Sequence, residues 1–327
     1  MLEHGGKLRA AAAGYGRALE DWVDLSAGLN PHWYPAPPVE GDAWHRLPED
    51  DPLLLDAARR YYGAPDLLAV AGTQAAIQAL PALRPPSRVA VAAPSYAEHA
   101  HHWGRHGHSM RQVPYESLDS ANCDVLVVCN PNNPTGARIP AECLLAWAGE
   151  LGQRGGWLVV DEAFADTSPE FSVAAHTGMP GLIVLRSVGK FFGLAGVRVG
   201  FVAAHAALLA RLADALGPWT VSGPAQQVCR AALLDLPWQQ AARAQLSEEG
   251  ARLHALLQVH GIEAHGCPLF QWWPEARPDA FHRHMAERGI WARLFTQAAR
   301  GIRLGLPANE RGWTRLDKAL REWSSTR

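Results

Sequence analysis

Four polar residues, Asn133, Asp161, Lys190 and Arg198, are predicted to lie at the ends of consecutive strands in the middle of the chain. A lysine that is partly buried beside other cations loses its proton near neutral pH, so Lys190 can act as a nucleophile toward an aldehyde. A carboxylate such as Asp161 can keep a heterocyclic nitrogen protonated. Residues 72–74, Gly-Thr-Gln, begin a helical stretch, and a helix N-terminus with small residues can hold a phosphate dianion.

Each of these residues also has a plainer interpretation when it is taken alone. A lysine after a strand is usually a solvated surface residue, an aspartate there is usually a helix N-cap, and residues 130–136 could be only a turn-rich loop. Together, however, they supply what a pyridoxal 5'-phosphate (PLP) site requires: an amine for the aldehyde, a carboxylate for the pyridine nitrogen and a phosphate clamp. Arg198 and the Ser187 hydroxyl can add to that clamp.

Short apolar runs alternate with helical stretches through the first two thirds of the chain, and these runs predict the strands that position the four residues. The predicted strands are 67–70, 89–91, 125–129, 157–160, 182–185 and 197–202. Strands separated by helices favour a mostly parallel α/β sheet that is covered on both faces. Open sheets of this kind bind ligands at the carboxyl ends of their strands.

The alternation of short apolar runs and helical stretches ends at about residue 222, which predicts a second, smaller α+β domain. Its predicted elements are a long helix at 239–259, strands at 262–264, 270–273 and 302–304, a helix at 279–288 and a final helix. We therefore expect a large domain at residues 36–222 and a small domain formed by residues 1–35 and 223–327. Taken alone, residues 1–35 are expected to form a flexible arm with a turn at Asn30-Pro31.

Composition excludes several classes of function. The chain has 327 residues, 48% of them hydrophobic, and a formal net charge of −2, so it has no basic surface for a nucleic acid. No apolar run is long enough to span a membrane, and the first residues do not form a signal peptide. Five widely spaced cysteines fit reduced thiols. We expect a cytoplasmic protein that binds a small metabolite.

Three motifs in the second quarter and middle of the chain carry a resemblance to a known family. They are NPNNPTG at residues 130–136, DEAF at 161–164 and SVGKFFGLAGVRVG at 187–200. Their order resembles that of the fold-type I PLP enzymes of the aminotransferase class I/II superfamily. The resemblance implies a large domain with a mostly parallel sheet of the seven-stranded type, a smaller α+β domain and a homodimer.

The resemblance also implies roles for individual residues. Lys190 binds the cofactor covalently, Asp161 pairs with its pyridine nitrogen, Asn133 hydrogen-bonds its 3-oxygen and Tyr96 stacks on its ring. The residues expected to bind the cofactor phosphate are Thr73, Gln74, Ser187 and Arg198. Arg303 resembles the arginine that grips the substrate α-carboxylate as a fork, and Arg293 supplies a second cation.

Within the superfamily the sequence resembles most the L-threonine-O-3-phosphate decarboxylases of cobalamin biosynthesis. The features that favour this branch are His4-Gly5-Gly6, DLSAGLNP at 24–31, RLPEDDP at 46–52, DEAF at 161–164 and the GKFFGLAG form of the lysine motif. The implied reaction is PLP-dependent decarboxylation of L-threonine O-3-phosphate to (R)-1-amino-2-propanol O-2-phosphate. The resemblance implies that the N-terminal arm folds over the active site, and His4, the backbone around Gly5 and Gly6, and Asn30 are then the candidate ligands of the substrate phosphate. The alternative is a histidinol-phosphate or related amino-acid aminotransferase.

Two positions depart from the aminotransferase pattern. Phe164 stands where a tyrosine would hydrogen-bond the cofactor's 3-oxygen, so Asn133 is expected to act there alone. Leu47 stands where relatives often have a tyrosine that reaches the neighbouring subunit's cofactor phosphate, and this puts that contact in doubt.

Three rival interpretations have less support. His102 and His106 have an i,i+4 spacing that can bind zinc, but no cysteine accompanies the histidines between residues 99 and 108, so we expect no metal site and a structural or solvated role for them. Glu98 is expected to be a structural or helix-surface residue. The glycines after Lys190 precede a strand, the wrong order for a dinucleotide loop. A non-catalytic sensor with this fold would carry a separate DNA-binding domain, and no such pattern precedes residue 35.

Overall fold

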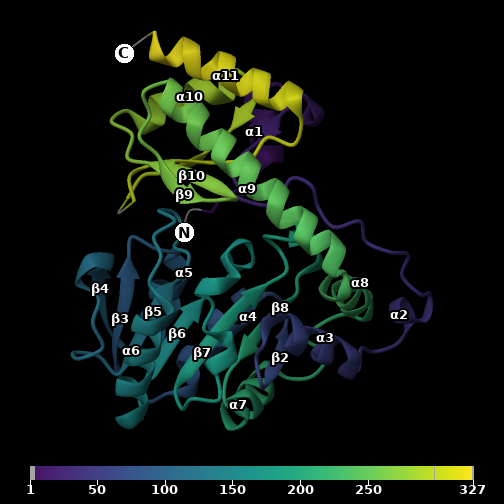
Figure 1. Cartoon of the computed structure of the whole chain (residues 1–327), viewed down its shortest axis with the longest axis vertical. Helices are drawn as coiled ribbons and strands as arrows, with labels where there is room; N and C mark the ends of the chain where they lie inside the picture. The colour runs from purple at the N-terminus through teal and green to yellow at the C-terminus, as the bar shows by residue number, and fades with distance from the viewer. Residues whose placement is uncertain (1–3, 298, 326–327) are drawn as a thin grey trace.

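A seven-stranded sheet built from residues 67–203 forms the lower part of the molecule in Figure 1. The computed structural model describes residues 4–297 and 299–325. The strands of this sheet are β2 (Leu67–Val70), β3 (Arg88–Ala93), β4 (Ser109–Pro114), β5 (Val125–Cys129), β6 (Trp157–Asp161), β7 (Leu182–Ser187) and β8 (Gly200–Ala203). Their order is β2-β8-β7-β6-β5-β3-β4, and β8 alone among them runs antiparallel to its neighbours. The predicted mostly parallel α/β sheet is confirmed.

The sheet differs from the sequence prediction at two strands. Strand β4 was not predicted because it is an edge strand whose residues are mostly exposed and which therefore lacks a continuous apolar run. Strand β8 begins at Gly200 rather than at residue 197, since Ala195–Val197 forms a 3-10 helix and Arg198 has a left-handed φ of 59°. This turn returns Arg198 to the strand ends.

Helices cover both faces of the large sheet, and one long helix joins it to the upper domain. The helices are α1 (Leu8–Tyr15), α2 (Asp42–His45), α3 (Pro52–Tyr62), α4 (Thr73–Ala79), α5 (Ala97–Arg105), α6 (Ala141–Gln153), α7 (Ala206–Leu216), α8 (Gly223–Leu234), α9 (Leu236–Val259), α10 (Pro278–Glu287) and α11 (Glu310–Ser324). Every residue of β5, β6 and β7 is buried, as expected for central strands with helices on both sides. Helix α9 runs diagonally from α8 to the small domain (Figure 1).

Short 3-10 helices lie in the connections. They are η1 (Leu19–Asp21), η2 (Leu80–Leu83), η3 (Tyr115–Ser117), η4 (Ala165–Thr167), η5 (Pro169–Phe171), η6 (Ala174–His176) and η7 (Ala195–Val197). Among the described residues, no helix is both long and apolar enough to cross a membrane.

The small domain is built on an antiparallel sheet with the order β12-β13-β10-β9. Its strands are β9 (His265–Cys267), β10 (Phe270–Trp273), β12 (Arg293–Phe295) and β13 (Gly301–Gly305), and a separate parallel pair joins β1 (Val23–Asp24) to β11 (Ile290–Trp291). The strand predicted at 262–264 was therefore misplaced, because the segment that pairs with β10 is β9, His265–Cys267. Helix α8, which follows the expected boundary at residue 222, contacts α3 on the large sheet.

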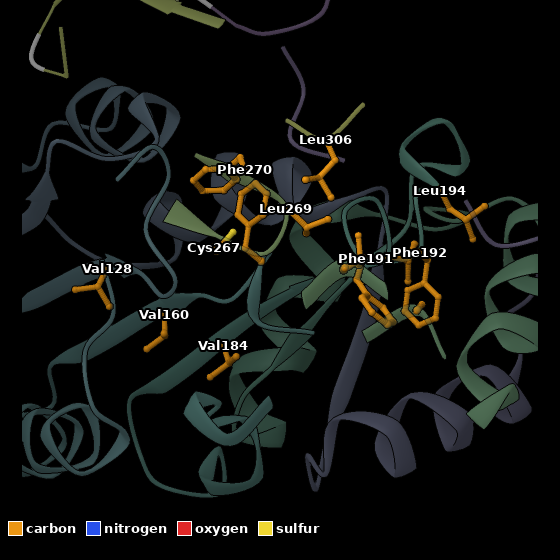
Figure 2. Packing of buried hydrophobic residues seen from close by; sticks show 14 of the residues in the cluster. Val128, Val160, Val184, Phe191, Phe192, Leu194, Cys267, Leu269, Phe270 and Leu306 are labelled. Carbon is orange, nitrogen blue, oxygen red and sulfur yellow. The ribbon is translucent and has the colours of Figure 1, made fainter. Parts of the chain in front are cut away.

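One buried apolar cluster continues from the large sheet into the small domain. Figure 2 shows Leu269 and Phe270 above the strands that carry Val160 and Val184. The ring of Phe270 meets Phe164 edge to face, with centroids 5.0 Å apart. This shared core fixes the position of the small domain over the strand ends, where the polar residues gather.

Candidate active site

A cavity of about 150 Å³ lies at the carboxyl ends of the central strands and brings the predicted cofactor residues together. Its lining consists of Gly72, Thr73, Gln74, Tyr96, Cys129, Pro131, Asn133, Asp161, Ala163, Phe164, Ser187, Gly189, Lys190, Ala195 and Arg198. All eight residues assigned to the cofactor from the sequence are in this set. The strand-end position follows from the parallel topology, because β5, β6 and β7 all end at the same edge.

Lys190 follows strand β7 and is half-buried in the cavity wall. Burial, together with the cations of Arg303 and Arg198, lowers its pKa to about 8, although Asp161 opposes the shift. The amine nitrogen lies 5.4 Å from the ring centroid of Phe164, an apolar neighbour that does not hydrogen-bond it. A substantial fraction of the lysine is therefore neutral, and nucleophilic, near neutral pH.

Asp161 ends strand β6 and is held at both carboxylate oxygens. Oδ1 accepts from Ala163 N at 3.0 Å, and Oδ2 lies 2.9 Å from Nε2 of His99. Burial is the largest single influence on His99 and opposes its protonation, but hydrogen bonds and charge from Asp161 and Cys129 together outweigh it and raise the pKa of His99 to about 10. The imidazolium is thus a donor that fixes the direction of the Asp161 carboxylate.

The opposite end of the cavity fits a phosphate group. Gly72 has a φ of 73°, and a Cβ at this position would lie 2.6 Å from Nη2 of Arg198. The guanidinium therefore packs against bare backbone at the start of α4, where the first amide groups of the helix face outward. Ser187 Oγ, which accepts from Gly189 N at 3.2 Å, lines the same end. A cation, a hydroxyl and free amides form a cradle that suits the phosphate of PLP.

The three asparagines of the NPNNPTG loop have different roles: two of them hold the loop in place, and the third faces the cavity. Asn130 exchanges hydrogen bonds with the backbone of Ile139, and Asn132 donates to Pro94 O and Thr135 Oγ1. Asn133 instead faces the cavity, where its Oδ1 accepts from Arg303 Nη1 at 2.5 Å. Among the described residues its Nδ2 donates to no acceptor, which leaves that amide for a ligand.

A larger cavity of about 750 Å³ continues from the first toward the small domain. Its polar lining includes His4, Ser95, Tyr96, His101, Gln112, Asn133, Lys190, Arg293, Thr296, Gln297 and Arg303, with the backbone of Gly5 and Gly6. Four of the five residues assigned to the substrate from the sequence, namely His4, Gly5, Arg293 and Arg303, are in this set.

Arg303 is the buried cation of the larger cavity. Its two hydrogen-bond acceptors, Asn133 Oδ1 and Ser26 O, are both neutral, and its buried Nε has no partner among the described residues. Burial and the neighbouring Arg293 lower the pKa of Arg303 to about 10, so it remains charged at neutral pH. A buried cation without a carboxylate partner is well suited to bind an anionic substrate.

Two predicted residues are used differently from the expectation. Asn30 lines neither cavity, because its Nδ2 donates to Phe191 O at 2.9 Å and its Oδ1 accepts from His32 N at 2.8 Å. The side chain of Gln74 accepts from Tyr96 OH at 3.2 Å and donates to Glu98 at 2.6 Å, so its backbone rather than its amide faces the phosphate end.

The sequence did not predict the contacts that the histidines and Glu98 of helix α5 make. His99 supports Asp161, and His102 lies 3.0 Å from the buried carboxylate of Glu98. The clue available was the i+3 step from Tyr96 to His99 on one helix, which places both on the cavity side. The His102–His106 pair proposed as a zinc alternative does not face a common ion, since His106 Nδ1 lies 2.8 Å from the backbone oxygen of His102.

Comparison with known proteins agrees with this geometry. The family model for aminotransferase class I and II matches residues 39–309. The chain belongs to this family. The resemblance inferred from the three motifs, and the fold class inferred with it, are confirmed.

Curated relatives in this family extend over nearly the whole chain. The threonine-phosphate decarboxylase of Pseudomonas aeruginosa is 52% identical, over 98% of this chain and 97% of the relative. The protein of the same name from a Sinorhizobium species is 43% identical, with the same shares covered. Among solved structures, histidinol-phosphate aminotransferase from Sinorhizobium meliloti, in complex with PLP, superposes with a TM-score of 0.82 at 22% identity, over 99% of this chain and 96% of that chain.

Proposed function

We propose that the chain is a PLP-dependent carboxy-lyase that converts L-threonine O-3-phosphate to (R)-1-amino-2-propanol O-2-phosphate and CO2 for cobalamin biosynthesis. The observation that carries this proposal is the near full-length similarity to two threonine-phosphate decarboxylases, at 52% and 43% identity. The site geometry supports it independently, because it combines a low-pKa lysine, a supported aspartate and a buried cation around connected cavities.

PLP is the cofactor, and the residues of the smaller cavity fit it from end to end. Lys190 would bind its aldehyde carbon, and Asp161 would hold its pyridine nitrogen. Asn133 Nδ2 would donate to its 3-oxygen, with Phe164 offering no second donor. The phosphate would occupy the cradle of Thr73, Ser187 and Arg198.

When bound, PLP accepts into its protonated ring the electron pair that is released when a bond to the substrate α-carbon breaks. The chain's own residues select the bond. Arg303 and Asn133 hold the carboxylate end of the substrate from the small-domain side, and Arg293 lies in the same cavity. Lys190, freed by the substrate amine, then holds at Nζ the proton that replaces CO2 on the α-carbon.

The N-terminal arm supplies the proposed contacts for the substrate phosphate. His4 and the backbone of Gly5 and Gly6 line the larger cavity opposite Lys190. Asn30 does not reach that cavity, so it contributes by holding the backbone next to Lys190: its backbone N donates to Lys190 O at 3.0 Å. We therefore assign it a supporting role.

We also propose a cytoplasmic homodimer. Support comes from exposed apolar side chains that cluster along residues 33–53 and on neighbouring segments, namely Trp33, Trp44, Leu47, Leu53 and Trp219. Helices α2, α3 and α8, which carry or contact these segments, lie together at one side of the molecule (Figure 1). All five cysteines are free, in keeping with a reducing compartment.

Product analysis tests the reaction. Purified protein loaded with PLP is incubated with L-threonine O-3-phosphate, and CO2 and the phosphorylated amine are quantified with and without 2-oxoglutarate. Stoichiometric CO2 release without 2-oxoglutarate is the expected result. Amino transfer that depends on 2-oxoglutarate, without CO2, would refute the proposal and indicate an aminotransferase.

A further inference from the structure

Glu98 is a buried carboxylate that the proposed reaction does not use. Its side chain is 10% exposed, and three donors converge on it. Nε2 of His4 lies 2.8 Å from Oε1, while Gln74 Nε2 at 2.6 Å and His102 Nε2 at 3.0 Å share Oε2. Burial alone would raise the pKa of Glu98, but the hydrogen bonds from Gln74 and His102 lower it below its usual value. The residue is therefore an ionised acceptor at neutral pH.

The three donors come from different parts of the site. His4 belongs to the N-terminal arm and lines the larger cavity, whereas Gln74 stands at the start of α4 and lines the cofactor cavity. Gln74 also accepts from Tyr96 OH at 3.2 Å. Glu98 is thus the point at which the arm joins the wall of the cofactor cavity.

The arm has a second attachment on the small-domain side. Gly6 N donates to Ser26 Oγ at 2.9 Å, and Trp291 Nε1 donates to Gly6 O at 2.7 Å. Ser26 O in turn accepts from Arg303 Nη2 at 2.7 Å. The short segment between His4 and Gly6 therefore spans the larger cavity between two anchors, and Gly5 fits there because a Cβ would lie 2.7 Å from Ser26 O.

The two anchors differ in strength. At Gly6 the arm is held by backbone hydrogen bonds that do not depend on its side chains. At the other end one side chain holds it: His4 is 42% exposed, its ring lies 6.2 Å from that of Tyr96, and its polar contact with the large domain is with the Glu98 carboxylate. A hydrogen bond to a charged acceptor is stronger than one between neutral groups. Removal of the Glu98 carboxylate therefore frees the His4 end of the arm, while the Gly6 end keeps its hydrogen bonds.

We propose that Glu98 is a positioning residue that anchors the N-terminal arm across the substrate cavity, so that His4 and the Gly5-Gly6 backbone are held in place for an anionic substrate. Glu98 acts through His4 and does not touch the reacting atoms. The effect of Glu98 on substrate binding rests on the proposed function, whereas its effect on the position of the arm does not.

Amide hydrogen exchange tests the anchor without any substrate. Peptides that contain residues 4–7 are followed by mass spectrometry in the PLP-loaded wild type, Glu98→Ala, His4→Ala and the double variant. Glu116→Ala is the matched control, since Glu116 is an exposed glutamate on η3 outside both cavities. We expect each single variant to speed exchange of the Gly6 amide about tenfold, because an arm released at His4 opens the neighbouring hydrogen bond from Gly6 to Ser26 more often. The double variant should add nothing further, because both changes break the same contact.

Steady-state kinetics with L-threonine O-3-phosphate give the second measurement. We expect Glu98→Ala and His4→Ala to raise KM about tenfold while kcat stays within about threefold and PLP affinity is unchanged. His4→Ala keeps the test valid if Glu98→Ala folds poorly, because His4 is on the exposed arm.

The outcomes separate the two proposals. Unchanged exchange in Glu98→Ala and His4→Ala overturns the anchor, as does full additivity in the double variant. A loss of PLP affinity with an unchanged arm also overturns it, since Glu98 would then act only through Gln74. If exchange rises as expected but the wild type releases no CO2, the anchor stands and the proposed reaction fails.

Discussion

Asp161 and Glu162 are neighbours in the chain, and both are buried carboxylates, yet they belong to two different ion clusters. Asp161 lines the cofactor cavity, and within the described part of the chain its charged partner is His99. Glu162 points into the core, where it shares Arg186 with Asp166 and also accepts from Ser172 Oγ and Val173 N. The two carboxylates differ in their surroundings: Asp161 borders a cavity, whereas protein groups surround Glu162.

The core cluster is closed by protein groups around Glu162. Arg186 contacts both carboxylates, at 2.5 Å and 2.8 Å, and its guanidinium packs over the ring of Tyr62. No residue of this cluster lines either cavity of the site. The cavity cluster instead presents Asp161, Lys190 and Arg303 toward the two cavities, whose lining suits a cofactor and an anion. Buried charge is therefore functional here where it borders a cavity, and structural where protein groups surround it.

The largest expected effect comes from removing the nucleophile of the cavity cluster. Lys190→Ala should lower CO2 release at least about 10³-fold, because no other group can bind the cofactor aldehyde in this position. The chain has only three lysines, Lys7, Lys190 and Lys318. Borohydride reduction of the PLP-loaded protein followed by peptide mapping should place the cofactor on Lys190, with the exposed Lys318→Ala as a control of unchanged activity. A cofactor found on Lys7 or Lys318 would contradict the assignment.

Matched amide substitutions at Asp161 and Glu162 test directly whether the first carboxylate is functional and the second structural. Asp161→Asn should lower kcat/KM by about 10²-fold or more, because a neutral amide cannot keep the pyridine nitrogen protonated. Glu162→Gln should keep kcat within a few fold of wild type and lower the free energy of unfolding by about 3 kcal/mol, because it removes one partner of a buried ion cluster.

Steady-state kinetics and urea unfolding of both variants measure the contrast. Urea midpoints and slopes show whether the loss is one of stability. If Glu162→Gln loses turnover as severely as Asp161→Asn while remaining fully folded, the division into functional and structural clusters is wrong.

The sequence predicted the cavity cluster better than it predicted the groups that support it. Asp161 and Lys190 were found because each follows a strongly apolar strand, and parallel strands bring their ends together whatever the details of packing. His99 and Glu98 were missed because their roles depend on how α5 is rotated against the strand ends, which local patterns do not fix. Asn30 was misjudged for the same reason: a buried amide can serve a ligand or a backbone, and only the packed structure shows which.

The class of the large sheet and the places of its central strands were predicted, and the margins of the fold were predicted less well. Central strands such as β5 and β6 are continuous apolar runs and were placed to within a residue. The edge strand β4 and the short strand β9 have few buried positions, since they gain their hydrogen bonds from tertiary pairing. Such strands carry no periodic signal of their own.

Arg303→Lys tests the other side of the cavity cluster with a smaller expected effect. Lysine keeps the charge but cannot contact Asn133 and Ser26 while also forking onto a carboxylate, so KM should rise about 10- to 100-fold. The free energy of unfolding should change by less than that of Glu162→Gln. Steady-state kinetics with L-threonine O-3-phosphate measure the KM, and Arg300→Lys, at an exposed position nearby, is the control. An unchanged KM would show that the carboxylate is held elsewhere.

The smallest expected effect concerns the pH dependence of stability at His99. The pKa of His99 is raised to about 10 in the folded protein, whereas its ordinary value is 6.5, because the hydrogen bonds and charges of Asp161 and Cys129 together outweigh burial. A raised pKa stabilises the fold fully below about pH 6.5, and this contribution is lost as the pH rises through 10. His99→Asn keeps a donor toward Asp161 but has no proton to lose. The wild type should therefore exceed the variant by about 2 kcal/mol at low pH, and by progressively less toward pH 10.

Urea unfolding of the cofactor-free proteins between pH 6 and pH 10 measures this difference, and His101→Asn, at an exposed position on the same helix, is the control. A difference that does not vary with pH would mean that His99 is a neutral hydrogen-bond donor in the folded protein. Asp161 would then have no charged partner, and its carboxylate would depend on the cofactor for its counter-charge. The contrast with Glu162, whose counter-charge is the permanent cation of Arg186, would become sharper, because the cavity cluster would be completed only when PLP is bound.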